Sequence, residues 1–251
     1  MEGDKFPREI TLCLSGGAAK GAFELGVLSV LEEHGVTIKA ISGVSIGAVI
    51  GASLACGNSA KKTYEILSSK EYKKIFKFRP KNGILFDIDT QSAIIKKLLP
   101  KQNFDELTIP LHIAVTDLLH ARVVYMTSGD LHKSVLASSA ISPLFAPVVI
   151  DGVYYSDGGI IDNFPVQELQ QYEYPIVGIN LYPNLKTLPR SFMSWVKKNI
   201  FLAWHSHNLE KNALCDYCFS SPKLSELKTF GFRDVQKGYD LGVEEAKRYL
   251  H

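Results

Sequence analysis

The first part of the chain alternates short apolar runs with glycine-rich turns and longer periodic stretches. Ile10–Leu14 is a β-prone run that ends in a turn at 15–17, and apolar residues then recur every three or four positions from Ala18 to Glu33. The same order returns with a strand over Ile38–Ile41 and a nearly all-apolar helix over 48–56. Two consecutive strand–turn–helix units predict an α/β fold with a parallel sheet and helices on its faces.

The remaining pattern adds helices and strands in mixed order. Two strands, Leu111–Thr116 and Arg122–Thr127, lie close enough in sequence to pair antiparallel, and Asp151-Gly152 favours a hairpin turn. After Asn184 the composition becomes loop-like, and the end of the chain is predicted to be helical with one break near Gly231. We expect a single domain over residues 1–251. Further predicted elements are helices over 61–78, 90–99 and 130–139 and strands over 148–150, 153–155 and 176–181.

One uncharged window interrupts this pattern. Ala40–Ala60 holds 21 residues without a charge, the length of a membrane span, with glycines at 43, 47 and 51 in the spacing of packed membrane helices. Several serines and an asparagine in the window would need partners in hydrocarbon, however, and few of its residues are large and aliphatic. A buried core element therefore fits the window better than a membrane span.

The net charge and the number of cysteines indicate which partners and which cellular compartment fit the protein. The 28 basic and 26 acidic residues leave a net charge of +2, which does not indicate a nucleic-acid partner. The first residues are charged and the apolar run after them is short, so no signal peptide is predicted. Four cysteines are too few for a disulfide scaffold in 251 residues, which favours a reducing, cytoplasmic location.

The turn between the second predicted strand and its helix reads Gly43-Val44-Ser45-Ile46-Gly47. In this context Gly-x-Ser-x-Gly makes a nucleophile elbow, since the glycines allow a turn sharp enough to expose the serine hydroxyl. The helix that begins there also directs its amide dipoles at Ser45. The alternative is close packing of helix on strand through small residues.

A nucleophilic serine also needs donors for the oxyanion, and the first turn offers them. Ser15-Gly16-Gly17-Ala18-Ala19-Lys20-Gly21 leaves a strand and enters a helix, so successive backbone N–H groups can point at one anionic oxygen. A dinucleotide fingerprint is the competing interpretation, but Ala18 occupies its middle glycine position and no acidic residue follows the next strand. A P-loop is excluded because the Gly-Lys-Ser/Thr ending is missing.

The best candidate for the base is an aspartate. Asp157 lies in Ser156-Asp157-Gly158-Gly159 just after a strand, where two glycines let the chain turn and free the carboxylate. A poorly solvated carboxylate can take the serine proton directly if its pKa is raised. The alternative is an ordinary surface turn. None of the seven histidines lies in a recognisable catalytic setting.

These motifs together resemble the patatin-like phospholipases, and in particular the small bacterial-type lipid acyl hydrolases of that family. Gly16–Gly21, Gly43–Gly47 and Asp157–Gly159 appear in that family's order and strand contexts. The segments Ala137–Pro143, Phe145–Pro147 and Asn163–Val166 also look like the family. The resemblance covers about residues 10–182, and the predicted helical extension over 183–251 carries none of these motifs.

The resemblance implies a lipid acyl hydrolase with a three-layer α/β/α fold, a mostly parallel sheet and no metal or other cofactor. It implies Ser45 as nucleophile, Asp157 as base, and the amides of Gly16, Gly17 and Ala18 as the oxyanion hole. Lys20 falls at the family's usual basic position. Gly21, Gly43, Gly47, Gly158 and Gly159 complete the motifs.

A basic segment lies outside these motifs. Lys70–Lys81 holds six basic residues and one acidic residue, with Tyr72, Ile75, Phe76 and Arg79 at helical spacing. Such a helix can rest on an anionic membrane surface or simply cover the core with its lysines in water. Nucleic acid is a weaker interpretation because no recognition fold accompanies the segment.

Three alternatives to the hydrolase hypothesis stay open at this stage. The chain could be a lipid- or acyl-chain-binding protein that kept the elbow with weak turnover. A Ser-Asp-His triad would need His205 or His207 near Ser45. The same two histidines with Cys215 and Cys218 form a set chemically able to bind zinc, although the resemblance implies no metal.

Overall fold

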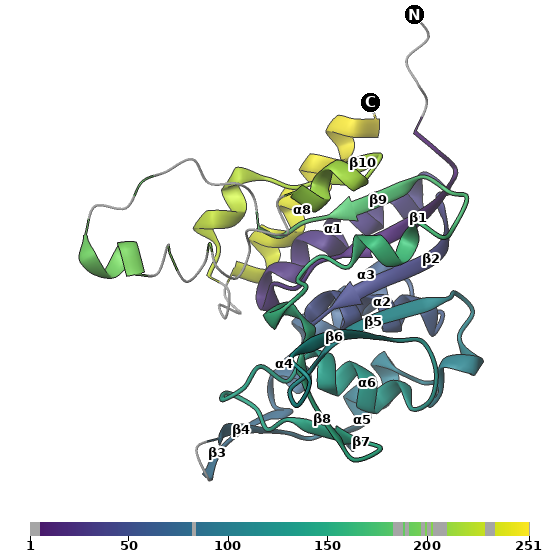
Figure 1. Cartoon of the computed structure of the whole chain (residues 1–251). Coiled ribbons are helices and arrows are strands. Elements are labelled where there is room, and N and C mark those ends of the chain that lie inside the picture. Colours follow the sequence, from purple (N-terminus) through teal and green to yellow (C-terminus); the bar gives the residue numbers. More distant parts are fainter. Residues whose placement is uncertain are drawn as a thin grey trace, which may run out of the picture.

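A mixed sheet of eight strands crosses the centre of the molecule, with helices packed beside it (Figure 1). This computed structural model describes residues 6–81, 84–182, 188, 191–196, 199, 202, 210–228 and 234–250. The strand order is β10-β9-β1-β2-β5-β8-β7, and β6 pairs with β5 outside this path. The strands are β1 (Glu9–Leu14), β2 (Thr37–Val44), β5 (Leu111–Asp117), β6 (Arg122–Met126), β7 (Val148–Ile150), β8 (Val153–Asp157), β9 (Ile176–Ile179) and β10 (Tyr217–Phe219).

The sheet is parallel from β10 to β5 and antiparallel beyond it. The parallel part follows from the two predicted strand–turn–helix units, because each helix returns the chain to the same end of the sheet. The predicted antiparallel pairing of β5 with β6 is confirmed. So is the hairpin between β7 and β8, where Asp151 and Gly152 adopt φ 50° and φ 80°. The prediction of an α/β fold with a mostly parallel sheet is confirmed.

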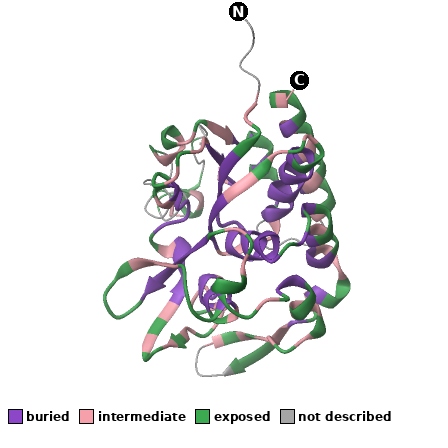
Figure 2. Ribbon diagram, turned by 90° about the vertical axis from the view of Figure 1, so that its right-hand side faces the viewer, coloured by how far each residue is buried: buried purple, intermediate pink, exposed green. Residues whose placement is uncertain are grey.

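Core residues cover both faces of the sheet. In β1, Ile10, Leu12 and Leu14 join the large core on the side of α2, whereas Cys13 joins a smaller core with Phe164 and with residues of η4 (Val166–Leu169). Figure 2 shows buried residues concentrated in the central strands and adjacent helices. The α-helices whose bounds lie within the described residues are α1 (Gly21–Glu33), α2 (Ile46–Ala55), α3 (Ala60–Ser68), α4 (Lys70–Lys73), α5 (Ala93–Leu98), α6 (Leu131–Ser138) and α8 (Val235–Leu250).

The predicted helix over 61–78 is only partly right, since the chain is helical in α3 and α4 but not beyond. Ser69 adopts an extended backbone between α3 and α4, and its hydroxyl accepts a hydrogen bond from the Tyr72 amide at 3.1 Å. The chain then leaves the helix for β3 (Phe76–Lys81), which pairs antiparallel with β4 (Ile84–Ile88). Tyr72 and Ile75 are buried in the core, whereas Arg79 lies in β3 and is exposed, so the three do not form one surface stripe.

The helical prediction for the end of the chain is only partly right. The sequence predicts a helix for the segment Cys215–Cys218, but this segment leads into β10 and forms part of it. Strand β10 pairs in parallel with β9 at the edge of the sheet. The Asp216 carboxylate accepts a hydrogen bond from the Ile176 amide at 2.7 Å and fixes this edge. A strand of three residues has too little periodicity for its sequence to identify it.

The uncharged window at Ala40–Ala60 supplies buried parts of the fold. It holds the end of β2, the turn at Ser45 and all of α2, a helix of ten residues. Within the described parts of the chain, none of the helices has the length and apolar character needed to cross a bilayer.

Helices α1 and α8 cross with their backbones in contact. A methyl group on Gly26 would overlap the carbonyl oxygen of Tyr239, and one on Gly242 would overlap the carbonyl oxygen of Phe23. Gly238, on the same helix as Gly242, has more room: its added methyl would lie 3.4 Å from the Cβ of Ala22. The close approach therefore depends on Gly26 and Gly242.

We expect Gly242→Ala to destabilise the protein by about 1–3 kcal/mol, because α8 must move away from α1 to admit the methyl group. The matched variant Gly238→Ala should be neutral or stabilising by up to about 1 kcal/mol, since alanine favours a helix. Urea denaturation of the two variants measures the difference. Equal stabilities would contradict the close crossing.

Candidate active site

Ser45 occupies a sharp turn between β2 and α2. Its φ of 55° and ψ of −123° are rarely adopted by a residue with a side chain, so the surrounding structure must hold it there. A methyl group on Gly43 would lie 2.6 Å from the carbonyl oxygen of Gly47, and one on Gly47 would overlap the backbone of Leu14. The glycines thus serve both the sharp turn and the close packing of α2 against the sheet.

Ser138, at the end of α6, holds the turn at Ser45 in place through hydrogen bonds. Its hydroxyl accepts a hydrogen bond from the Ser45 amide at 2.9 Å and donates one to the Ala114 carbonyl oxygen at 2.7 Å. Ser138 is fully buried, so these two bonds compensate the cost of removing its hydroxyl from water. The sequence contains Ser138 in the family-like segment Ala137–Pro143, but motif analysis gives it no role.

Asp157 ends β8 beside β5 and is only 2% exposed. Its Oδ1 accepts a hydrogen bond from the Gly159 amide at 2.8 Å, and the Thr116 hydroxyl donates to its backbone carbonyl at 2.9 Å. Its Oδ2 has no partner in good hydrogen-bonding geometry among the described residues. One carboxylate oxygen is thus anchored and the other remains available.

Burial raises the pKa of the Asp157 carboxyl to about 7, while the Ser45 hydroxyl and the Gly159 amide act in the opposite direction. The effect of the hydroxyl on this pKa means that Ser45 and Asp157 face each other, although their approach is looser than a well-formed hydrogen bond. An aspartate with this pKa is partly ionised at neutral pH and can accept and return a proton.

The glycine loop lies against this pair. A methyl group on Gly16 would lie 3.3 Å from the Cβ of Ser45, and Ala18 adopts a left-handed φ of 49°. The Gly16 amide already donates to the Asn163 carbonyl oxygen at 3.3 Å. Within the described structure no acceptor is recorded for the amides of Gly17 and Ala18. Two of the three amides predicted to bind an oxyanion are therefore available.

Asn163 joins the glycine loop to the Asp157 turn. Its Nδ2 donates to the Gly16 carbonyl oxygen at 3.3 Å, and methyl groups on Gly16 and Gly159 would each collide with its Oδ1. The sequence contained this residue in a family-like segment but gave it no role. Only the fold shows that the side-chain amide of Asn163 lies between the glycine loop and the Asp157 turn.

Lys20 lies at the end of the loop and is almost completely buried. Its Nζ lies 5.1 Å from the centroid of the Tyr182 ring, and burial lowers the pKa of the ammonium group. No ion pair of Lys20 with an acidic side chain occurs in the described part of the chain.

Other aspartates of this region are engaged by neighbouring side chains or exposed to solvent. Asp117 pairs with His120 at 2.8 Å and with Arg122 at 3.3 Å. Asp162 accepts a hydrogen bond from the Tyr125 hydroxyl at 2.7 Å and pairs with Lys211 at 2.6 Å. Asp151 lies in the exposed turn between β7 and β8.

The histidine alternatives depend on two residues that the structure does not describe. His205 and His207 lie outside the described residues, so neither the triad nor the zinc set can be placed. Of the described histidines, His112 contacts the Tyr172 hydroxyl at 2.9 Å and His132 contacts two backbone carbonyls at 3.0 Å. Among described residues, no three His, Cys, Asp or Glu side chains are grouped so as to hold a metal.

The sequence that carries these motifs matches a known family over more than half of the chain. The pattern of the patatin-like phospholipases matches residues 12–169, which include the glycine loop, the elbow and the Asp157 turn. This chain belongs to the patatin-like phospholipase family. The fold is also similar to that of a solved structure, VipD from Legionella pneumophila, with a TM-score of 0.57 and 16% identity. That match covers 97% of this chain and 67% of VipD.

Several patatin-like relatives are much longer than this chain. Patatin-like phospholipase domain-containing protein 6 of Mus musculus is 31% identical, over 95% of this chain and 20% of its own length. An uncharacterized NTE family protein of Mycobacterium bovis is 29% identical, over 72% of this chain and 48% of its own. Lysophospholipase NTE1 of Mycosarcoma maydis is 28% identical, over 62% of this chain and 9% of its own. The chain thus spans half or less of the length of these relatives.

Burial of Asp157 in the patatin-like site predicts a pH-dependent cost in stability. The folded carboxyl has a pKa of about 7, whereas an unfolded aspartate has about 3.9. The folded protein therefore binds more protons between these values, and its stability falls as pH rises through them. We expect Asp157→Asn to be more stable than wild type at pH 8, by as much as about 4 kcal/mol, and to lose this advantage toward pH 4.

Urea denaturation at several pH values measures this difference. The matched control is Asp151→Asn, which removes an exposed carboxylate and should follow the wild type at every pH. An Asp157→Asn variant less stable than wild type at pH 8 would show that burial does not raise the pKa of this carboxyl.

Proposed function

We propose that the protein is a serine esterase that hydrolyses acyl esters of phospholipids or lysophospholipids, with Ser45 as nucleophile and Asp157 as base. The observation that carries the proposal is the buried Asp157 carboxyl with a pKa of about 7 that faces the Ser45 hydroxyl. Membership of the patatin-like family and similarity to a lysophospholipase support the substrate class.

The first half of the reaction transfers the acyl group to the protein. Asp157 Oδ2 accepts the proton of the Ser45 hydroxyl as Oγ bonds to the ester carbonyl carbon. The carbonyl oxygen becomes an oxyanion, which the amides of Gly17 and Ala18 bind, since neither has another recorded acceptor. When the ester C–O bond breaks, Asp157 returns the proton to the leaving alcohol.

The second half releases the acyl group. Asp157 accepts a proton from water as the water oxygen bonds to the acyl carbon. The bond to Ser45 Oγ then breaks, and Oγ recovers the proton from Asp157, leaving a free carboxylic acid. Every proton in this scheme moves through one carboxylate, so the proposed reaction needs no metal or cofactor.

The exposed hairpin of β3 and β4 supports contact with a membrane surface. It projects from one end of the molecule (Figure 1). Phe78 is 66% exposed and Leu85 37%, while Lys70, Lys74 and Arg79 nearby are also exposed. Apolar side chains beside basic ones suit anionic lipid, because the apolar groups enter the interface and the charges meet the head groups. We therefore place the lipid surface at this hairpin and not on a helical face.

Ser45→Ala tests the nucleophile. We expect loss of at least about a thousandfold in kcat/KM for a lysophospholipid, because no hydroxyl remains to form the acyl intermediate. A fluorophosphonate probe should label the wild type and not this variant. The matched control Ser68→Ala, on α3, should keep both activity and labelling.

The pH profile of the same reaction tests the base. Asp157 must be ionised to accept the proton, so kcat/KM should rise with pH up to about 7 and then level off. A folded wild type without hydrolysis or fluorophosphonate labelling would contradict the esterase proposal and favour an acyl-chain-binding protein. Full activity in Ser45→Ala would contradict the role of Ser45.

The double variant Phe78→Ser, Leu85→Ser tests the membrane surface. Co-sedimentation with phosphatidylglycerol vesicles should weaken at least tenfold, since burial of each apolar side chain contributes about 1.5–3 kcal/mol. Wild-type binding should also weaken with added salt. The matched control Val149→Ser, Tyr154→Ser changes exposed apolar residues in β7 and β8, and equal loss in both double variants would contradict a specific role of the hairpin.

A further inference from the structure

Three of the four cysteines gather around Gly178, near the edge of the sheet where β9 and β10 lie side by side (Figure 1). Cys13 in β1 and Cys218 in β10 are both paired with Gly178, one on each neighbouring strand. Paired residues of a parallel sheet point to the same face. The third thiol lies over this face, because a methyl group on Gly178 would lie 2.6 Å from the Sγ of Cys215. Cys13, Cys215 and Cys218 thus form one thiol cluster.

A bend before β10 places Cys215 over the sheet. The chain bends at Asp216, and the strand begins at Tyr217. The Asp216 amide donates to the Ile176 carbonyl oxygen at 2.9 Å, and its carboxylate accepts from the Ile176 amide at 2.7 Å. The bend is therefore fixed to β9, and it keeps the Cys215 sulfur above Gly178.

The arrangement of the three thiols favours one pair. Strand β9 separates Cys13 from Cys218, so their Cα atoms are about 9–10 Å apart, beyond the reach of about 7 Å that a disulfide allows. Cys215 and Cys218 interact directly: a hydrogen bond from the Cys215 thiol lowers the pKa of Cys218 and raises that of Cys215. This hydrogen bond is the largest influence on the pKa of either thiol.

The reactivity of the four cysteines differs in the same sense. Cys13 is fully buried and Cys56 is 8% exposed, and burial raises the pKa of both thiols. Cys215 and Cys218 are half-buried, so a small reagent has partial access to them. The thiolate is the reactive form, and Cys218 is the only one of the four whose pKa is lowered. Cys218 is therefore the most reactive cysteine, and Cys215 is its nearest partner.

We propose that Cys215 and Cys218 form a redox-modification site that closes a disulfide when the protein meets a hydroperoxide. The Cys218 thiolate attacks one peroxide oxygen, the O–O bond breaks, and the leaving oxygen takes up the thiol proton, which leaves a sulfenic acid on Cys218. The Cys215 sulfur then bonds to Cys218 Sγ, and the displaced hydroxyl takes the Cys215 proton and departs as water.

The two thiols together lose two electrons in this reaction, and the hydroperoxide accepts them. A low-molecular-weight thiol reverses the change by exchange through a mixed disulfide. In a reducing compartment such a disulfide is transient, which suits a redox-sensing role better than a structural one.

Peptide mass analysis tests the site. The folded protein is treated with hydrogen peroxide, then unfolded in iodoacetamide and digested with trypsin. Cleavage after Lys211 and Lys223 yields a peptide over residues 212–223 that contains Cys215, Cys218 and no other cysteine. We expect this peptide to lose two hydrogen atoms and to take no alkyl group, whereas Cys13 stays alkylated. Dithiothreitol should restore alkylation at both positions.

Single variants separate the two roles. Cys215→Ser removes the thiol that closes the disulfide, so dimedone should trap the sulfenic acid on Cys218. In Cys218→Ser, dimedone should label Cys215 at least about tenfold more slowly, because its pKa is raised. The matched control Cys56→Ser removes a buried cysteine in the large core on the other face and should form the disulfide as the wild type does. Thermal unfolding verifies that each variant is folded.

Three results would overturn the proposal. They are alkylation of both Cys215 and Cys218 in the peroxide-treated wild type, a disulfide that joins Cys13 to Cys215, and oxidation of Cys56 as fast as that of Cys218. None of these measurements uses an ester, so the redox site and the esterase proposal stand or fail separately.

Discussion

The site depends on the strained backbone at Ser45. A residue with φ 55° and ψ −123° stays in place only where neighbouring groups determine its position. Gly43 and Gly47 let α2 approach the sheet, and the hydrogen bonds from Ser45 to Ser138 and from Ser138 to Ala114 join the turn to β5. A distortion of any of these contacts would move the hydroxyl relative to Asp157, which begins its own turn beside the same strand.

Stability and chemistry have opposite demands at Asp157. Its burial disfavours the charged form and so weakens the folded state above neutral pH, yet the same burial gives the carboxyl a pKa of about 7. The protein retains one hydrogen bond to this carboxyl, from the Gly159 amide, and leaves Oδ2 without a well-formed partner among the described residues. A more fully bonded carboxylate would cost less stability and would have a lower pKa.

Segments without site motifs contact the elements that position the glycine loop and Asn163. Lys211 pairs with Asp162, which also accepts a hydrogen bond from the Phe164 amide and so holds the segment that contains Asn163. Helix α8 packs its glycine face against α1, the helix that follows the glycine loop. The end of the chain thus fixes elements that position the loop and Asn163, although its sequence carries no recognisable chemistry.

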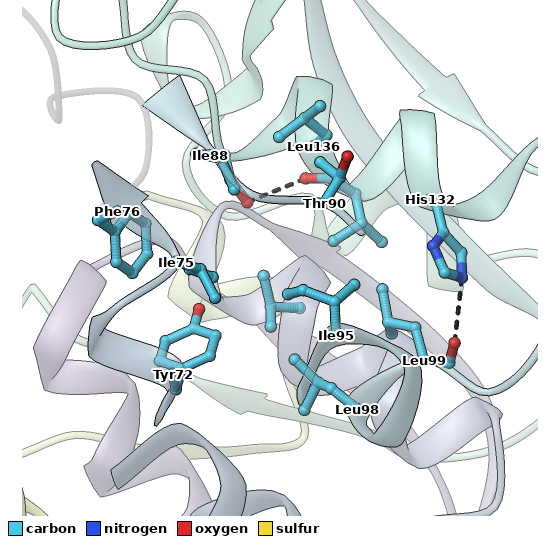
Figure 3. A pocket seen from close by; sticks show the side chains of 13 residues that line it. Tyr72, Ile75, Phe76, Ile88, Thr90, Ile95, Leu98, Leu99, His132 and Leu136 are labelled. Atoms are coloured by element: carbon cyan, nitrogen blue, oxygen red, sulfur yellow. Dashed lines mark hydrogen bonds between the residues drawn. The ribbon is translucent and has the colours of Figure 1, made fainter. Parts of the chain in front are cut away.

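The sequence by itself determined the two strand–turn–helix units, the elbow at Ser45 and the turn at Asp157, because glycine spacing and apolar periodicity are local signals. It did not determine β3, β10 or the end of α3, since short strands and single capping serines have little periodicity. Only the tertiary structure decided that Ser138 and Asn163 contact the turn at Ser45 and the glycine loop, and that Gly16 already uses its amide. It alone also shows an apolar pocket between the β3–β4 hairpin, α5 and α6 (Figure 3). These features join residues far apart in the chain, so their causes are packing and burial, which no local pattern records.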